Sequence, residues 1–329
     1  MFRTRSTTRS TTRSTTGRTV ARRNNLVACV LAAGALALAA CSSGGGSPKT
    51  VSVAAAALDT IKPGAIKVAV EAYAPYTSEN NGGISQQTQI TGLDADILNA
   101  AAAKLGLTVE PVVTDFAGML ASVQARRVDI TIGGVAWTAE RQKQGLFTDP
   151  PYYSPPAMAV ASGKTFHTVD DLQNQQLGTV EGYVWIKSIK AVPGATLHAY
   201  PDATSVFSDL SAGRISAAFL DPLIIIDAQK HGQKIQTQYL TPPTADQIKA
   251  HPDYSYFAPY MTGFYLPKQE PKLEAALDAQ IRAMYADGEL TALITKYGGD
   301  PQQFLKPAPD FATDRRGLDR PADWTPPSV

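Results

Sequence analysis

The chain has 329 residues, of which 44% are hydrophobic and 18% charged, so it has the composition of a globular protein and the length of two ordinary domains. Its net charge of +1 conceals an asymmetry, because residues 1–40 contain seven arginines and no lysine or acidic residue. The rest of the chain therefore carries 23 basic and 29 acidic residues. A mildly acidic body argues against nucleic acid as a partner.

The first 40 residues predict a targeting segment. A basic tract repeats Arg-Ser-Thr-Thr over residues 5–16, and an apolar run occupies residues 26–40. An apolar run of that length suits the core of a signal peptide and is too short to span a bilayer. The run ends in Leu-Ala-Ala-Cys at Cys41, which resembles a bacterial lipobox. The resemblance implies cleavage before Cys41 and lipidation of that cysteine, with palmitate among its acyl chains; the alternative is an ordinary signal peptide and an incidental cysteine.

Neither a metal site nor a cofactor site is predicted. Cys29 lies in the segment expected to be removed and Cys41 would carry lipid, so no thiol remains for a disulfide or a metal. The four histidines are scattered without the spacing of metal ligands. The sequence also lacks the motifs G-x-S-x-G, H-E-x-x-H and the P-loop.

Strands and helices alternate through the first part of the mature chain. After a Gly/Ser-rich linker, apolar periodicity predicts strands at 67–70, 107–113 and 128–132, with helices at 93–105 and from residue 116 to residue 123. This β-α-β-α-β order predicts a parallel sheet covered by helices.

The pattern restarts after residue 156, which predicts a second lobe. Expected strands lie at 157–161, 177–180, 196–200 and 215–220, and expected helices at 169–172, 184–190 and 203–210. Residues 233–260 are interpreted as a long loop, with a lid or an extra hairpin as alternatives. The remaining expected elements are a strand at 263–267 and helices at 272–285 and 289–297. A proline-rich, charged tail follows at 307–329.

Residues 130–153 carry the most informative local pattern. A β-branched run ends at Gly133-Gly134, and Thr138 can cap a helix whose first turn contains Arg141. A cation in the first turn opposes the helix dipole, and a broken local rule suggests a functional site. A bound carboxylate, held by helix amides and the guanidinium, would explain the pattern. The alternative is an ordinary surface arginine in an ion pair.

Several short segments, taken in order over residues 60–300, resemble the family-3 solute-binding proteins of polar amino-acid ABC importers. They are Ala74-Pro75-Tyr76, Gly92-Leu93-Asp94-Ala95-Asp96, Asp115-Phe116, Val128-Asp129-Ile130, Thr138-Ala139-Glu140-Arg141, Phe147-Thr148-Asp149-Pro150, Tyr152-Tyr153, residues 214–221, Ala286-Asp287-Gly288 and Tyr297-Gly298. The resemblance implies an α/β, periplasmic-binding-protein-like fold in which two lobes, joined by two crossing strands, close over one ligand.

On this basis the chain divides into five parts. They are a signal peptide at 1–40, a lipidated cysteine and flexible linker at 41–58, lobe one at 59–153 plus 262–306, lobe two at 154–261, and the tail at 307–329. The crossings are expected near residues 152–156 and 260–264.

Two charged residues are expected to hold the ligand. A free amino acid presents a carboxylate and an ammonium, and burying both is costly unless each is paired. The resemblance assigns Arg141 to the carboxylate. Asp221 is the candidate for the ammonium, because it follows a strand at the edge where open α/β sheets place ligands. The alternative for Asp221 is a plain helix cap followed by Pro222 at the first helical position.

Aromatic and backbone groups complete the expected site. Tyr73 and Phe116 match family positions that flank the ligand, and Trp137 either faces the ligand or packs behind it. Further donors and acceptors are expected from the backbone around Gly134, Ala136 and Thr138.

The chain departs from the family at the expected site in two ways. Tyr183 follows Gly182 where the family often has a small serine or threonine, and Val70 and Val180 replace polar contacts of some relatives. A tyrosine at residue 183 either donates through its hydroxyl or fills the pocket. The pocket should therefore favour a neutral or aromatic side chain, or a cation held over aromatic rings.

The expected function is that of an extracytoplasmic lipoprotein, monomeric and anchored to the cell membrane through Cys41. It would capture an amino-acid-like ligand and deliver it to the membrane subunits of an ABC importer. The alternatives are a secreted enzyme on the same fold, of the cyclohexadienyl dehydratase type with Glu181 as its only nearby carboxylate, and a ligand-sensing subunit.

Overall fold

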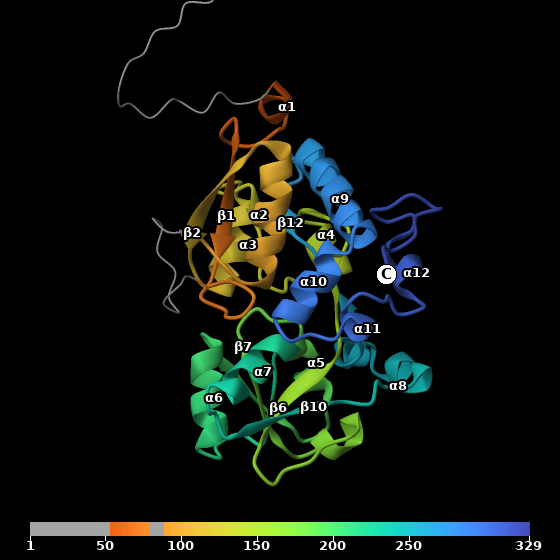
Figure 1. Cartoon of the computed structure of the whole chain (residues 1–329). Coiled ribbons are helices and arrows are strands. Elements are labelled where there is room, and N and C mark those ends of the chain that lie inside the picture. The colour runs from red at the N-terminus through yellow and green to blue at the C-terminus, as the bar shows by residue number, and fades with distance from the viewer. Residues whose placement is uncertain (1–52, 79–88) are drawn as a thin grey trace, which may run out of the picture. The chain divides into compact units, whose positions relative to one another are not determined.

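The computed structural model describes residues 53–78 and 89–329 (Figure 1). The predicted signal peptide at residues 1–40, the lipidation site Cys41 and most of the predicted linker lie outside the described residues. The end of that linker contains a short helix, α1 (Val53–Ala56). Within the described residues no helix has the length and apolar character needed to cross a membrane.

The first sheet is built from both ends of the mature chain. Its strand order is β2-β1-β3-β12-β4. Strand β1 (Ala65–Val70) pairs in parallel with β2 (Thr108–Val113) and β3 (Ile130–Thr131), as the β-α-β-α-β order predicts. Strand β12 (Tyr265–Leu266) runs antiparallel between β3 and β4 (Leu146–Phe147). Figure 1 shows β12, coloured blue, beside strands from the first half of the chain.

The helices of this lobe follow the predicted apolar stripes. Helix α2 (Leu93–Leu105) ends at Gly106, whose left-handed backbone closes the helix as expected of a C-terminal glycine. Helix α3 (Phe116–Gln124) starts at the cap Asp115. The C-terminal helices of the lobe are α9 (Pro271–Ala286), which buries Leu273, Leu277, Ile281 and Met284, and α10 (Glu289–Lys296).

The second sheet has the order β10-β6-β9-β7-β8 and is mixed. Strand β7 (Gln176–Val180) is parallel to β8 (Thr196–Tyr200) and β9 (Ala217–Phe219), whereas β6 (Ala157–Ala161) is antiparallel to β9 and to β10 (Ile235–Tyr239). Its helices are η1 (Val169–Leu172), α5 (Trp185–Ala191), α6 (Ala203–Ser211) and α7 (Pro222–Lys230). The predicted α/β class with two lobes is confirmed.

The interpretation of residues 233–260 as a long loop is wrong. The segment contains β10, helix α8 (Ala245–Ala250) and the 3₁₀ helix η2 (Pro252–Phe257). Strand β10 lies at the edge of its sheet, where its polar Gln-Thr-Gln centre is tolerated. The same polar residues lack the apolar pattern by which a strand is predicted from sequence. A capping box of Thr244 and Gln247 starts α8.

Two short strands connect the lobes. Strand β5 (Tyr153–Ser154) pairs antiparallel with β11 (Tyr260–Met261), so that Tyr260 faces Ser154 and Met261 faces Tyr153. These strands fall within the predicted crossings. We retain the lobe limits given above, residues 59–153 with 262–306 and residues 154–261, as a proposal that this pairing supports.

Residues 307–329, expected to form a proline-rich tail, pack against the folded body. The chain forms α11 (Pro301–Phe304) and α12 (Phe311–Arg315) and then continues without regular structure. The side chains of Phe311, Arg315 and Trp324 are buried, Arg315 completely. A fully buried arginine requires fixed oxygen partners, so these residues belong to the folded structure.

Candidate ligand-binding site

A small cavity is lined by both lobes. Its lining residues are Phe116, Gly133, Gly134, Ala136 and Arg141 from the first lobe, Tyr183, Val184, Trp185 and Asp221 from the second, and Tyr260 from β11. The cavity measures about 240 Å³ including space that is open to solvent.

The guanidinium of Arg141 reaches across this cavity. Arg141 lies in the short helix α4 (Ala139–Gln142). As predicted, Thr138 caps this helix: its Oγ1 accepts a hydrogen bond from the amide of Arg141 at 3.0 Å. Its Nη1 donates to the carbonyl of Ala136 at 2.8 Å and its Nη2 to the carbonyl of Gly182, in the other lobe, at 2.9 Å. These bonds use two of five guanidinium N–H donors. The guanidinium therefore keeps free donors for an anion, whereas the amide of Arg141 in the helix is already bonded to Thr138.

The guanidinium of Arg141 also has an aromatic neighbour. Its Cζ lies 5.3 Å from the ring centroid of Phe116, a cation–π distance. Burial lowers the pKa of Arg141, although an arginine remains charged at neutral pH. The cavity therefore holds a fixed positive charge on the side of the first lobe.

Asp221 supplies negative charge from the second lobe. It occupies the cap position of α7 with Pro222 next to it, yet its side chain makes no capping hydrogen bond. The carboxylate instead accepts hydrogen bonds from Tyr73 Oη at 2.8 Å and from the hydroxyl of Tyr260. Asp221 is 4% exposed, and burial raises its pKa to about 7 although both tyrosine hydrogen bonds lower it. The plain-cap alternative does not describe this side chain, which is directed at the cavity.

Gly134 shapes the wall beside Asp221. Its φ of +69° is a left-handed conformation, and a Cβ at this position would lie 3.1 Å from Asp221 Oδ2. Its amide, expected to serve the ligand, already donates to Asp94 Oδ2 at 2.8 Å, as does the amide of Gly133 at 2.6 Å. Asp94 thus holds the backbone turn in place. Gly134 offers no free N–H donor, but its lack of a side chain lets the backbone lie close to Asp221.

Aromatic rings enclose the cavity. Tyr183 lies edge-on to Phe116 and to Tyr73, with centroid distances of 4.8 and 6.1 Å. Of the two alternatives for Trp137, the structure selects packing behind the wall, because its indole donates to Asp319 Oδ2 at 3.3 Å. The ring of Tyr183 therefore forms part of the cavity wall, and its hydroxyl donates to Glu71.

Two residues that the sequence did not assign, Trp185 and Tyr260, line this cavity, and a third, Glu71, contacts the lining residue Tyr183. Glu71 is 8% exposed and accepts from Tyr183 Oη at 3.2 Å; burial and the nearby Asp221 raise its pKa to about 7. The signal was present, because Glu71 directly follows β1 at the carboxyl edge of the sheet. Tyr260 was hidden in the segment interpreted as a loop. Among the described residues no group of three or more His, Cys, Asp or Glu side chains could hold a metal ion.

Comparison with known proteins identifies a family match over most of the chain. The model of the bacterial extracellular solute-binding proteins, family 3, matches residues 66–300. Two relatives from Escherichia coli strain K12 are a histidine-binding periplasmic protein and an L-cystine-binding protein. The first is 26% identical over 238 residues, covering 68% of this chain and 84% of the relative. The second is 28% identical over 230 residues, covering 69% and 79%.

Solved structures agree with the sequence comparison. The crystal structure of the substrate-binding protein of an amino acid ABC transporter superimposes with a TM-score of 0.61 and 26% identity. It covers 71% of this chain and 99% of its own.

Proposed function

Because the chain belongs to the bacterial extracellular solute-binding proteins of family 3, we propose that it captures one amino acid in the cavity between its lobes. One observation carries this proposal. A guanidinium from the first lobe, Arg141, and a carboxylate from the second, Asp221, line the same cavity. This arrangement complements the two charges of a free amino acid, because the guanidinium can pair with the ligand carboxylate and Asp221 with the ligand ammonium.

Ligand capture exchanges one set of bonds for another. Arg141 now donates to the carbonyl of Gly182, and Asp221 accepts from Tyr73, each across the boundary between lobes. A ligand carboxylate takes the place of the Gly182 carbonyl and forms a charge-assisted, two-pronged pair with the guanidinium. The ligand ammonium contacts Asp221. Each buried charge keeps a partner, which is the condition for burying it at all.

Delivery to an ABC importer and a lipid anchor extend the proposal. Relatives are named as periplasmic binding proteins, which supports an extracytoplasmic site of action. We propose that the membrane subunits of an importer are the partners and that Cys41 carries the anchor. When radiolabelled palmitate is supplied to cells, the wild-type protein should become labelled and Cys41→Ala should not. Equal labelling of both proteins would contradict the anchor and leave the ligand site untouched.

Binding without turnover is proposed over an enzyme on the same scaffold. Glu181, the carboxylate suggested for proton transfer, is exposed and does not line the cavity. Glu71 has a suitably raised pKa, but it does not line the cavity, and its carboxylate accepts a hydrogen bond from the hydroxyl of Tyr183. An acid–base group must come within hydrogen-bond reach of the substrate.

A ligand screen tests the proposal. Purified protein is heated with each common α-amino acid, and the matching amine and acid that lack one charged group serve as controls. One amino acid, or a few of related side chain, should raise the melting temperature as concentration rises, because the ligand binds only the folded state. The amine and the acid should shift it far less. Product formation from the stabilising compound would favour the enzyme, and equal shifts with the amine alone would contradict the two-charge site.

A further inference from the structure

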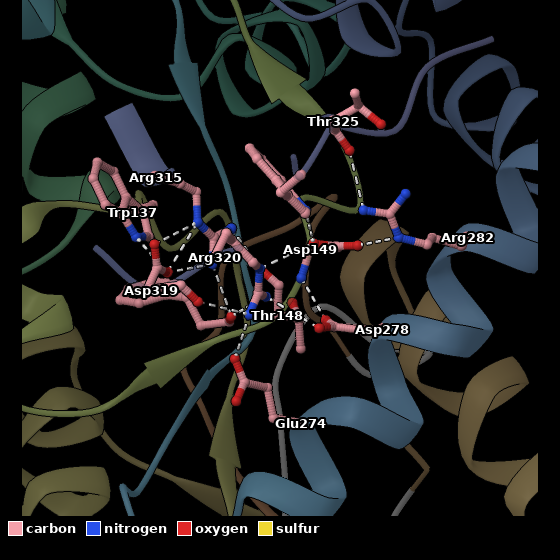
Figure 2. Close-up of polar contacts among 12 residues, drawn as sticks. Trp137, Thr148, Asp149, Glu274, Asp278, Arg282, Arg315, Asp319, Arg320 and Thr325 are labelled. Carbon is pink, nitrogen blue, oxygen red and sulfur yellow. Dashed lines mark hydrogen bonds and ion pairs between the residues drawn. The ribbon is translucent and has the colours of Figure 1, made fainter. Parts of the chain in front are cut away.

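We propose, on the basis of the function proposed above, that the C-terminal segment 307–329 positions one wall of the ligand cavity, and that it acts through Trp137. The segment lies beyond the residues matched by the family model, 66–300. It is fixed to the first lobe, to the strands that connect the lobes, and to the outer side of the wall. Figure 2 shows the polar contacts that fix it.

Arg315 is the main anchor to the first lobe. Its side chain is completely buried. Nη1 donates to the carbonyl of Thr148 at 2.9 Å, and Nη2 donates to the carbonyl of Phe147 at 3.0 Å and pairs with Asp319 Oδ2 at 2.6 Å. Two carbonyls and a carboxylate satisfy this cation, so the segment is held in one register against the strand end at residues 147–148.

Arg320 forms a second anchor with a network of acids. It lies 3.2 Å from Asp149, 2.8 Å from Glu274 and 3.1 Å from Asp278, and its Nη2 also donates to the carbonyl of Phe147 at 2.6 Å. The side chain is 9% exposed, so water screens these pairs far less than surface pairs. Networks of several partly buried charges hold geometry better than isolated surface pairs.

The segment also contacts both strands that connect the lobes. The ring of Phe311 stacks on Tyr153 of β5 with centroids 5.5 Å apart, and Tyr153 Oη donates to the carbonyl of Pro327 at 2.6 Å. Phe311, Trp324, Tyr153 and Met261 form a small buried cluster separate from the main core. Since Met261 belongs to β11, the segment packs against both β5 and β11.

Trp137 joins this assembly to the ligand cavity. Its indole donates to Asp319, its ring lies 5.7 Å from Arg315 Cζ, and its amide donates to the carbonyl of Met261 at 2.8 Å. The adjacent Ala136 carbonyl is the one that holds Arg141 Nη1. A shift of Trp137 would therefore move the acceptor that orients the guanidinium. Trp137 and Asp319 are positioning residues, because neither lines the ligand cavity itself.

Two gentle variants test the link in ligand-free, full-length protein. Trp137→Phe keeps an aromatic ring and removes the indole donor, and Asp319→Asn keeps the shape and removes the charge. In hydrogen exchange, amides of residues 134–138 and 260–264 should exchange about tenfold faster in each variant, the factor expected for one lost hydrogen bond to a charged group. Strands β7, β8 and β9 should be unchanged. The double variant should exchange no faster than Asp319→Asn alone, because that change weakens the Trp137 bond and also removes the charge that pairs with Arg315.

A spectroscopic signature separates positioning from general stability. Protein labelled with ¹⁵N-tryptophan gives indole signals for three tryptophans, and Trp137→Phe assigns one of them. Asp319→Asn should shift the Trp137 signal and leave that of Trp185, whose indole donates to the Tyr256 carbonyl in the second lobe. Asp323→Asn, an exposed carboxylate of the same segment, is the matched control and should change nothing.

Three results would overturn the proposal. They are unchanged exchange at residues 134–138 in both variants, an equal rise in β7–β9, and a Trp137 signal that is indifferent to Asp319→Asn. None of these measurements needs a ligand. They therefore decide the positioning role even if no amino acid binds, and the ligand screen fails or succeeds independently of them.

Discussion

Replacement of Arg141 by alanine should reduce amino-acid affinity by at least about a hundredfold. The variant would leave the buried ligand carboxylate without its charged partner, and breaking one side of a buried ion pair costs roughly 3–5 kcal/mol. The ligand itself could not recover the loss, because the other groups at this end of the cavity, the Ala136 and Gly182 carbonyls, repel a carboxylate. Calorimetric titration with the amino acid found in the screen measures the effect.

Two further variants control this experiment. Arg141→Lys keeps the charge and loses the planar fork, so its affinity should fall between those of the wild type and the alanine variant. Arg127→Ala removes an exposed arginine of the same lobe and should bind as the wild type does. If Arg141→Ala bound within threefold of the wild type, the carboxylate would have to be held elsewhere.

Asp221→Asn should weaken binding strongly and also reduce its pH dependence. In the ligand-free protein the pKa of Asp221 is raised to about 7, chiefly by burial. Contact with the ligand ammonium lowers the pKa of Asp221. Below pH 7 the carboxyl of Asp221 is therefore protonated before binding, and it must release that proton when the ligand binds. Affinity should therefore rise as pH increases from about 5.5 to 7.5, by up to tenfold per unit, and then level off. The asparagine variant has no proton to expel at residue 221, so its weaker binding should vary much less over this range, and what variation remains is assigned to Glu71, whose pKa is also about 7.

Stability of the ligand-free protein gives a second readout of the same carboxyl. A folded-state pKa above the unfolded value means that the folded protein binds more protons, so the free energy of unfolding falls as pH rises from about 4 to 7. Asp221→Asn should reduce this fall. Asp246→Asn, an exposed carboxylate in the same lobe, should leave both the stability profile and the binding profile unchanged. A wild-type affinity independent of pH would refute the assigned role of Asp221.

Local signals in the sequence were sufficient where the structure is determined by near neighbours. The end of α2 at Gly106 and the capping of α4 by Thr138 depend on residues within one or two turns, and both were predictable. The position of Asp221 at a strand end was also readable, because topology alone puts such residues at the ligand edge.

Features decided by distant contacts were not predictable from the sequence. The buried state of Glu71 depends on Tyr183, which is 112 residues away in the chain. Arg315 looks like an ordinary charge in a proline-rich stretch until the carbonyls of Phe147 and Thr148 are brought to it. Composition reports only how polar a segment is, and a polar segment with fixed partners is indistinguishable in sequence from one without them.

Strand β12 comes late in the chain, and this position limits the order in which the two sheets can be completed. Strand β4 has β12 as its neighbour in the sheet, and β3 pairs with β12 on one side, so the first sheet remains incomplete until residues 265–266 have been synthesised. The second sheet is drawn from one uninterrupted stretch, residues 157–239, and needs nothing from either end. The second sheet can therefore be completed while the first sheet, although begun earlier, still lacks its last strand.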